Sequence, residues 1–150
     1  MNIQDYIAVD PTSTTGLRWI KPRRGTTLGA AAFTAVDSYG YFCGCFAGRK
    51  YTAHRVIFFL VHGYWAAQVD HIDGVRKNNT PTNLREATAN VNQHNKVCKG
   101  YTRRGNKYQA QIMVNGAARN LGYFQTEEDA RAAYLNAKRE LHPTAPARCY

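Results

Sequence analysis

The sequence predicts an α+β fold built from two small modules, because strand-like runs in each half are followed by helical stretches. A length of 150 residues suits one ordinary domain or two small ones. Hydrophobic residues make up 44% of the chain and aromatic residues 12%, which is enough to bury cores. We expect a module over 1–98, a second over 99–142 and a loosely held tail over 143–150, with the boundary at Lys99–Gly100.

The first module begins with strand-like runs and continues into helices. Residues 17–21 predict a short strand, and residues 32–53 predict a β-hairpin that turns at "DSYG". A helix is expected to begin after Thr52, a good N-cap, and to end at Gly63. A second, shorter helix is expected over 89–97, with Thr88 as its N-cap.

The second module predicts a three-stranded antiparallel sheet covered by one helix. Its strand-like runs are 100–103, 107–114 and 118–124, separated by "RRGN" and "NGA". The closing helix has a strong start, because Thr126 can cap it and three acidic residues follow in the first turn. Its apolar stripe consists of Ala130, Ala133, Tyr134, Ala137 and Leu141.

The chain is strongly basic, with a formal charge of +10 and a pI near 9.7. Residues 1–95 hold ten Lys and Arg against six Asp and Glu, and residues 96–150 hold ten against four. Such an excess favours a polyanionic partner, nucleic acid first and an anionic membrane surface second.

Two further observations bear on compartment and cofactor. No stretch approaches the roughly 20 apolar residues of a membrane span, and the N-terminus lacks a signal-peptide pattern, so we expect a cytoplasmic protein with no membrane partner. The four Cys include no C-x-x-C pair, so no zinc site is expected. Cys43 and Cys45 are expected to be reduced and buried.

The stretch "VDHIDGVRKNNTPTNL", residues 69–84, carries the chemistry. It places Asp70, His71 and Asp73 close together and follows them with several Asn. One interpretation is a solvated loop, since Asp-Gly and Asn-rich stretches are ordinary turn material. The other is a metal-dependent active site, because phosphodiester cleavage needs a base, a cation and stabilisation of the leaving oxygen.

The spacing favours the second interpretation. Asp70-His71 is followed by Asn83 after twelve residues and by Asn92 nine residues later. With "HIDG", "NLREAT" and "NQHNK", this pattern resembles the HNH endonucleases, in the subgroup common among phage-borne homing-type nucleases. The resemblance covers roughly residues 15–97. It implies a ββα-metal hairpin and helix and metal-dependent cleavage of double-stranded DNA to 5′-phosphate and 3′-hydroxyl ends.

The resemblance and the chemistry together assign roles to five side chains. His71 is the expected general base, with a pKa suited to proton transfer near neutrality. Asp70 and Asn92 are the expected ligands of Mg²⁺ or Mn²⁺, since both offer hard oxygen donors. The resemblance implies that Asn83 braces the loop and orients His71. His94 lies about 200° around the helix from Asn92, so we expect it to have a structural or phosphate-facing role.

Other polar residues of the first module receive lesser roles. Asp73 is expected to form the Asp-Gly turn, and His54 is expected to be a buried, hydrogen-bonded residue. Cations near the motif are candidates for phosphate contact, namely Arg55, Arg76, Lys77 and Arg85.

Residues 99–142, "KGYTRRGNKYQAQIMVNGAARNLGYFQTEEDARAAYLNAKRELH", resemble the AP2 DNA-binding domain. That family lays a three-stranded sheet in the major groove and backs it with one helix. Gln and Arg on the outer face can pair with adenine and guanine edges respectively. The expected DNA contacts are Arg103, Arg104, Lys107, Gln109, Gln111 and Arg119.

The sequence therefore predicts an HNH-type DNA endonuclease that an AP2-like module positions on double-stranded DNA. An alternative is a non-catalytic, sequence-specific DNA-binding regulator, and an RNA-associated basic protein has only the charge in its favour. We expect a monomer or a weak dimer and no small-molecule substrate.

Overall fold

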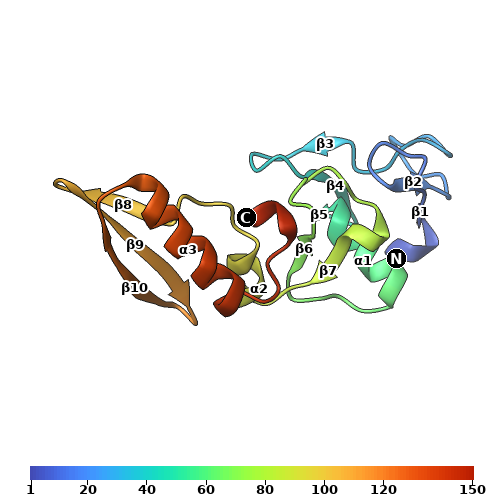
Figure 1. Cartoon of the computed structure of the whole chain (residues 1–150). Coiled ribbons are helices and arrows are strands. Elements are labelled where there is room, and N and C mark those ends of the chain that lie inside the picture. The colour runs from blue at the N-terminus through green and yellow to red at the C-terminus, as the bar shows by residue number, and fades with distance from the viewer. The chain divides into compact units, whose positions relative to one another are not determined.

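A computed structural model describes residues 1–150, except for the side chain of Ala89. The chain divides into two compact units, Met1–Glu86 and Ala87–Tyr150, which are described separately here (Figure 1). This division precedes the second helix, whereas the sequence predicts a boundary at Lys99–Gly100. As a result, Asn92, the last residue of the predicted motif, belongs to the second unit.

The first unit contains three small antiparallel sheets and one α-helix. Its strands are β1 (Ile7–Val9), β2 (Leu17–Trp19), β3 (Ala35–Val36), β4 (Phe42–Phe46), β5 (Arg49–Thr52), β6 (Val69–His71) and β7 (Leu84–Glu86). The helix α1 is Ala53–His62, and two short 3-10 turns are η1 (Ile3–Asp5) and η2 (Pro81–Asn83). The pairs are β1–β2, β3–β4–β5 and β6–β7.

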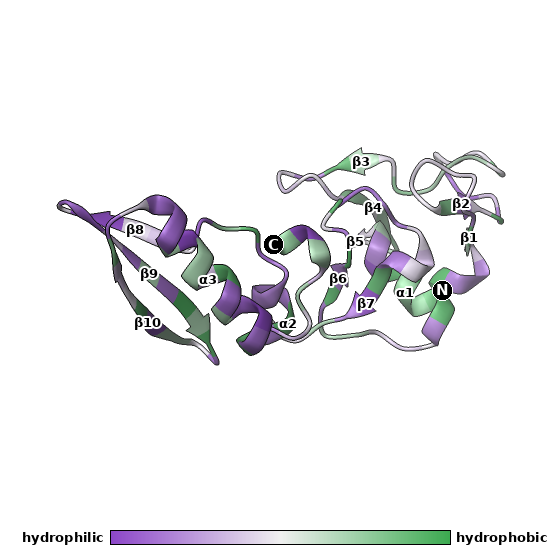
Figure 2. Cartoon of the chain, viewed as in Figure 1, coloured by the Kyte–Doolittle hydropathy of each residue, from purple (hydrophilic) through white to green (hydrophobic). Residues whose placement is uncertain are grey.

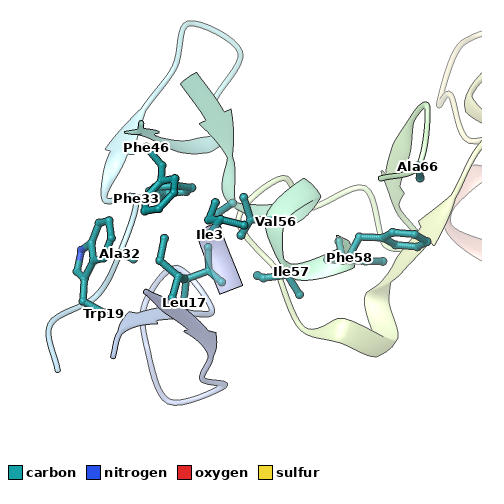
Figure 3. Close-up of a cluster of buried hydrophobic side chains, with 13 residues drawn as sticks. Ile3, Leu17, Trp19, Ala32, Phe33, Phe46, Val56, Ile57, Phe58 and Ala66 are labelled. Carbon is teal, nitrogen blue, oxygen red and sulfur yellow. The ribbon is translucent and has the colours of Figure 1, made fainter. Parts of the chain in front are cut away.

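Helix α1 occupies the centre of this unit. It begins after Thr52 and ends at Gly63, whose φ of 80° lets its N–H bond to the Phe59 carbonyl. Side chains from η1, the N-terminal strands and α1 meet in one core (Figure 3). The innermost of these include Leu17, Val56 and Ile57, each with no exposed surface. The helix therefore begins and ends where the sequence predicts.

The predicted hairpin is confirmed as β3–β4, which turns over residues 37–41. The prediction that both of its cysteines are buried is half wrong. Cys43 is buried, whereas Cys45 is exposed. Cys45 pairs with Lys50, next to the tight turn that joins β4 to β5, and at this end of β4 it is the neighbouring Phe46 that packs into the core.

The second unit contains a short helix and a three-stranded sheet covered by a longer helix (Figure 1). Its elements are α2 (Ala89–His94), β8 (Tyr101–Arg104), β9 (Lys107–Val114), β10 (Ala117–Phe124), α3 (Glu127–Leu141) and η3 (Ala147–Cys149). The sheet is antiparallel in the order β10–β9–β8. The predicted arrangement of three strands and one helix is thus present.

Helix α3 packs on the sheet through a narrow apolar stripe. Ala130 and Tyr134 are buried on the helix, and Ala110 and Ile112 are buried on β9. Figure 2 shows the hydrophilic colour that covers much of α3, as expected for a helix with one buried face. Thr126 caps the helix by accepting the Asp129 N–H at 3.1 Å. The cap is the one that the sequence predicts.

The C-terminal tail contradicts the prediction that it is loosely held. Residues 147–149 form η3, and Cys149 is buried. The Arg148 guanidinium donates to the Asn95 carbonyl at 3.0 Å, just beyond the end of α2. The tail is held because Arg148 supplies hydrogen bonds to a helix end that lacks intrahelical partners.

None of the helices in the described part of the chain is both long and apolar enough to cross a membrane.

Candidate active site

The motif 69–84 forms an antiparallel hairpin, in which β6 and β7 enclose a long connecting loop. Asp70 lies opposite Arg85, and His71 lies opposite Leu84. The Arg85 Nη2 and Nε both bond to Asp70 Oδ2, at 3.1 and 3.3 Å. This cross-strand pair fixes the orientation of the Asp70 carboxylate. Arg85 therefore holds a predicted metal ligand, in contrast to its predicted phosphate contact.

His71 is buried, with only 3% of its surface exposed, and lies among aromatic rings. The ring of Tyr41 lies 5.8 Å from it with an interplanar angle of 27°, and that of His54 lies 5.0 Å from it. Tyr41 directly precedes β4 and His54 lies on α1, so both come from outside the motif. The surroundings of His71 limit its motion and its contact with bulk water.

Asn79 fixes the imidazole of His71 through its own carboxamide. The Asn79 Nδ2 donates to the Thr15 carbonyl at 2.9 Å, so its Oδ1 is the atom that faces His71 Nε2, at 3.0 Å. Since a carboxamide oxygen only accepts, Nε2 must carry the hydrogen, and the lone pair is on Nδ1. Asn79 is itself buried, with 5% exposed. The arrangement leaves Nδ1 as the nitrogen that can accept a proton.

Asn83 braces the loop after His71. Its Nδ2 donates to Asp73 Oδ1 at 2.9 Å and to the Asn78 carbonyl at 2.8 Å, and its Oδ1 accepts the Asp73 N–H at 3.1 Å. Burial raises the pKa of Asp73, but hydrogen bonds from Asn78, Asn83 and the Val75 N–H outweigh it, so this pKa lies below its usual value. Asp73 is therefore an ionised anchor of the turn. Asn79 is a side-chain partner of His71, and the role of Asn83 in orienting His71 stays a prediction.

His54 is buried, as predicted, and it lies beside the predicted base. Burial, His71 and Arg55 lower the pKa of His54 from 6.5 to about 3. Its Nε2 lies 3.5 Å from the Thr52 Oγ1. His54 is thus a neutral imidazole in the wall around His71.

Asn92 and His94 lie on α2, which belongs to the second unit. Thr88 caps this helix by accepting the Val91 N–H at 3.3 Å. The His94 ring stacks on His142 at 4.1 Å, and its Nδ1 shares a hydrogen bond of 2.6 Å with the Thr144 hydroxyl. His94 therefore has packing contacts of the structural kind that the sequence predicts for it.

The predicted DNA contacts fall in both units. In the first unit, Arg76 donates to the Tyr39 carbonyl at 2.8 Å, and the Lys77 ammonium lies 5.6 Å from the Phe42 ring. In the second unit, Gln109 is half-buried and accepts from Arg104 Nε at 3.3 Å. The others on that sheet are exposed: Arg103, Lys107, Gln111 and Arg119.

Comparison with known proteins identifies the motif. Residues 51–94 match the HNH endonuclease family. The chain is also 36% identical, over 100 residues, to an uncharacterized HNH endonuclease of Acanthamoeba polyphaga mimivirus. That match covers 61% of this chain and 54% of the viral protein, so the chain spans about half of that relative's length. No solved structure matches the chain.

The matched residues 51–94, called the HNH segment below, begin in β5 and end with α2. They contain α1, the β6–β7 hairpin and the motif positions Asp70-His71, Asn83 and Asn92. Among the residues that the structure describes, no three His, Cys, Asp or Glu side chains gather into a metal cluster. The predicted donors, Asp70 and Asn92, would supply one carboxylate and one carboxamide oxygen. Two such oxygen ligands fit Mg²⁺ or Mn²⁺, which keep several waters in their coordination shell.

Two of the residues that surround His71 have no role predicted from the sequence. They are Asn79 and Tyr41. Asn79 is one of several Asn in a polar loop, and only its bond to Thr15 sets it apart. Tyr41 is one of four aromatic residues in the β3–β4 hairpin. The bond from Asn79 to Thr15 and the contact of Tyr41 with His71 join segments that are distant in sequence, and periodicity carries no signal for them.

Proposed function

We propose that the protein is an HNH-type endonuclease that hydrolyses phosphodiester bonds in double-stranded DNA with a divalent metal. The observation that carries the proposal is the hydrogen bond between Asn79 and His71 Nε2, inside a segment that matches the HNH endonuclease family. It leaves the His71 Nδ1 lone pair to accept a proton, as a general base requires.

The proposed roles follow from these contacts. His71 Nδ1 takes the proton of the attacking water, while Asn79 keeps the ring in the required tautomer. Asp70, oriented by Arg85, and Asn92 would hold Mg²⁺ or Mn²⁺. When bound, the metal would stabilise the charge on the scissile phosphate and the leaving 3′ oxygen. Asn83 and Asp73 maintain the loop that carries Asn79.

The second unit is proposed to position the nuclease on DNA. Its three-stranded sheet, single helix and exposed cations support an AP2-like role in the major groove. A phage-type, homing-endonuclease-like origin is part of the same proposal and has the sequence resemblance as its support.

Supercoiled plasmid provides the test. The wild-type chain should nick or linearise plasmid with Mg²⁺ or Mn²⁺ and lose this activity in EDTA. His71→Ala should reduce the rate by roughly 10²–10⁴-fold, the usual cost of removing a general base, with DNA affinity unchanged. Asn92→Ala should also lose metal-dependent cleavage, whereas His62→Gln, at the exposed end of α1, should cut at the wild-type rate.

The same experiment separates the alternative function. A chain that binds plasmid tightly but leaves it intact with every divalent metal would be a DNA-binding regulator. Cleavage by His71→Ala at the wild-type rate would mean that another residue is the base.

A further inference from the structure

A cavity of about 550 Å³ lies in the first unit, beside the start of α1. Its walls include Arg49, Lys50, Tyr51, Thr52, Arg55 and Trp65. Its volume is within the range of pockets that bind small organic molecules or parts of larger ones. Only Arg55 of this set belongs to the DNA contacts predicted from the sequence.

The cations of the cavity exceed its anions. Arg49, Lys50 and Arg55 face one carboxylate, Asp37, and none of the three forms an ion pair in the part of the chain that the structure describes. The backbone N–H groups of Tyr41 and Tyr39 bond to Asp37 Oδ1, both at 2.9 Å, which binds that carboxylate to its own turn. The cavity therefore keeps an excess of positive charge.

One of these cations is held in place before any ligand arrives. The Arg55 guanidinium donates through Nη2 to the Ala66 carbonyl at 3.1 Å. Fixing a guanidinium in this way reduces the entropy that it loses when it binds an anion. The cavity is thus prepared for a phosphate or a carboxylate.

Part of the cavity wall is aromatic. Trp65 stacks on Phe59, with ring centroids 4.5 Å apart and an interplanar angle of 6°, and the Tyr51 ring lies 5.4 Å from Trp65. Trp65 is nevertheless 40% exposed. Aromatic surface beside cations is the combination that binds single nucleotides, because bases stack on the rings while cations neutralise the phosphate.

The cavity shares its walls with the packing around His71. Thr52 lines the cavity, and its hydroxyl lies 3.5 Å from His54 Nε2. The His54 ring lies 5.0 Å from that of His71. Tyr41, whose N–H bonds to Asp37 in the cavity wall, lies 4.9 Å from the same His54 ring. The cavity wall is therefore linked to the proposed base through Thr52 and the His54 ring.

We propose that this cavity is a nucleotide subsite of the nuclease, which binds one unpaired nucleotide of the DNA substrate close to the scissile bond. Its phosphate would contact Arg49, Lys50 and Arg55, and its base would lie against Trp65 and Tyr51. The inference rests on the proposed nuclease function and adds a specific requirement to it. A base inside a duplex is stacked on its neighbours, so the substrate must open locally before this contact forms.

A double-mutant cycle between protein and DNA tests the contact. The cut site is first mapped on plasmid and placed in a short duplex, and an abasic residue is then introduced at each position around it. In the wild-type chain, one position should raise KM by roughly 5- to 100-fold, the cost of losing one base–aromatic stack. In Trp65→Ala the same abasic substitution should cause no further increase in KM. In Trp65→Phe it should raise KM as it does in the wild type.

The cations have their own measurement and control. The Arg49→Gln/Lys50→Gln double variant should raise KM with kcat unchanged and reduce the slope of log affinity against log salt by about 2. Arg24→Gln removes one exposed cation that does not line the cavity, and it should leave KM unchanged. If the abasic and Trp65→Ala effects add at every position, the subsite does not exist.

A binding experiment separates this inference from the nuclease proposal. His71→Ala is mixed with a single-stranded dinucleotide in EDTA, and tryptophan fluorescence is followed. The chain has two Trp, and Trp19 is buried with 7% exposed, so quenching should come from Trp65 and disappear in Trp65→Phe. Quenching without plasmid cleavage would support the subsite and reject the nuclease. Cleavage without quenching, with unchanged KM in Trp65→Ala, would do the reverse.

Discussion

At the scale of single residues, Asn79 sets the chemical state of His71. Its carboxamide is oriented by the Thr15 carbonyl, and its Oδ1 therefore requires a hydrogen on His71 Nε2. Asn79→Ala should leave the ring free to exchange tautomers and to rotate. We expect the nicking rate to fall roughly 10- to 100-fold, less than the roughly 10²–10⁴-fold expected when the base itself is removed.

The measurement joins kinetics to spectroscopy. Nitrogen NMR of the His71 ring should find the proton on Nε2 in the wild-type chain and a mixture of tautomers in Asn79→Ala. Asn78→Ala is the matched control, because this neighbour contacts Asp73 and the Thr80 hydroxyl in the same loop. An unchanged tautomer in Asn79→Ala would show that another group positions His71.

His54 gives the stability of the protein a dependence on pH. Its pKa is about 3 in the folded chain and about 6.5 when exposed, chiefly because burial disfavours the charged ring. Between these values the unfolded chain binds a proton that the folded chain does not. The free energy of unfolding should therefore decrease as pH falls below 6.5, by up to about 1.4 kcal/mol per pH unit from this group.

His54→Gln should remove this contribution. Urea unfolding at pH 7, 6, 5 and 4 should give a shallower loss of stability for His54→Gln than for the wild type. His62→Gln, at the exposed end of α1, is the control and should follow the wild-type curve. Parallel curves for wild type and His54→Gln would mean that His54 is protonated in the folded chain.

Single residues also show which parts of the site can be predicted from the sequence. The spacing of Asp70, His71 and Asn83 resembles the HNH pattern, which implies a hairpin followed by a helix, and these residues do lie within one antiparallel hairpin. Asn79 bonds to Thr15 across 64 residues, and Tyr41 comes from another hairpin. Such contacts depend on how the core packs, which no local pattern encodes. Lys138 also depends on such a contact. It has no exposed surface, and its ammonium donates to the Lys96 carbonyl at 2.6 Å.

At the scale of elements, the segment that connects α2 to the β8–β9–β10 sheet depends on Gly100. It has a φ of 80°, and a Cβ at this position would lie 1.9 Å from the Tyr134 ring on α3. Tyr134 is buried, with 3% exposed. The close approach of β8 to α3 therefore requires a residue without a side chain.

Gly100→Ala should destabilise the second unit by about 2–5 kcal/mol. Left-handed backbone costs about 1–2 kcal/mol for a residue with a Cβ, and forcing an extra methyl into a packed core adds about 1–3 kcal/mol. Gly105→Ala separates the two terms, because Gly105 has a φ of 60° with nothing within 4 Å of its Cβ position. Calorimetry of the full chain should give a loss for Gly105→Ala of the backbone part alone. Equal losses for the two variants would contradict the packing argument.

The elements themselves were largely predictable, because caps and turn residues are local signals. Thr126 and Thr88 cap the helices that the sequence assigns to them, and Gly63 ends α1. The end of α2 was not predictable to the residue. It stops at His94, where the sequence predicts a helix as far as residue 97, and Arg148 from the tail bonds to the next residue, Asn95. A tail contact of this kind is set by tertiary packing.

At the scale of the whole molecule, the division between the two units falls inside the HNH segment. Asp70, His71 and Asn83 belong to the first unit, and Asn92 belongs to the second. The sequence predicts that a nuclease module ends at residue 98, because its motif is complete there. Contacts instead join α2 to α3 and the tail, through the stack of His94 on His142 and the bond from Lys138 to the Lys96 carbonyl.

Three fragments, 99–150, 87–150 and 1–98, test which boundary is real. Fragment 99–150 lacks Lys96 and His94, which leaves the buried Lys138 ammonium without its carbonyl partner, a cost of at least about 1–3 kcal/mol. Fragment 87–150 keeps both and should melt at a higher temperature. Fragment 1–98 contains every motif residue but none of the elements that pack on α2. It should nick plasmid at least roughly tenfold more slowly than the full chain at saturating DNA, since Asn92 loses its support. If 1–98 cuts at the full rate and 99–150 is as stable as 87–150, the boundary lies at Lys99–Gly100 after all.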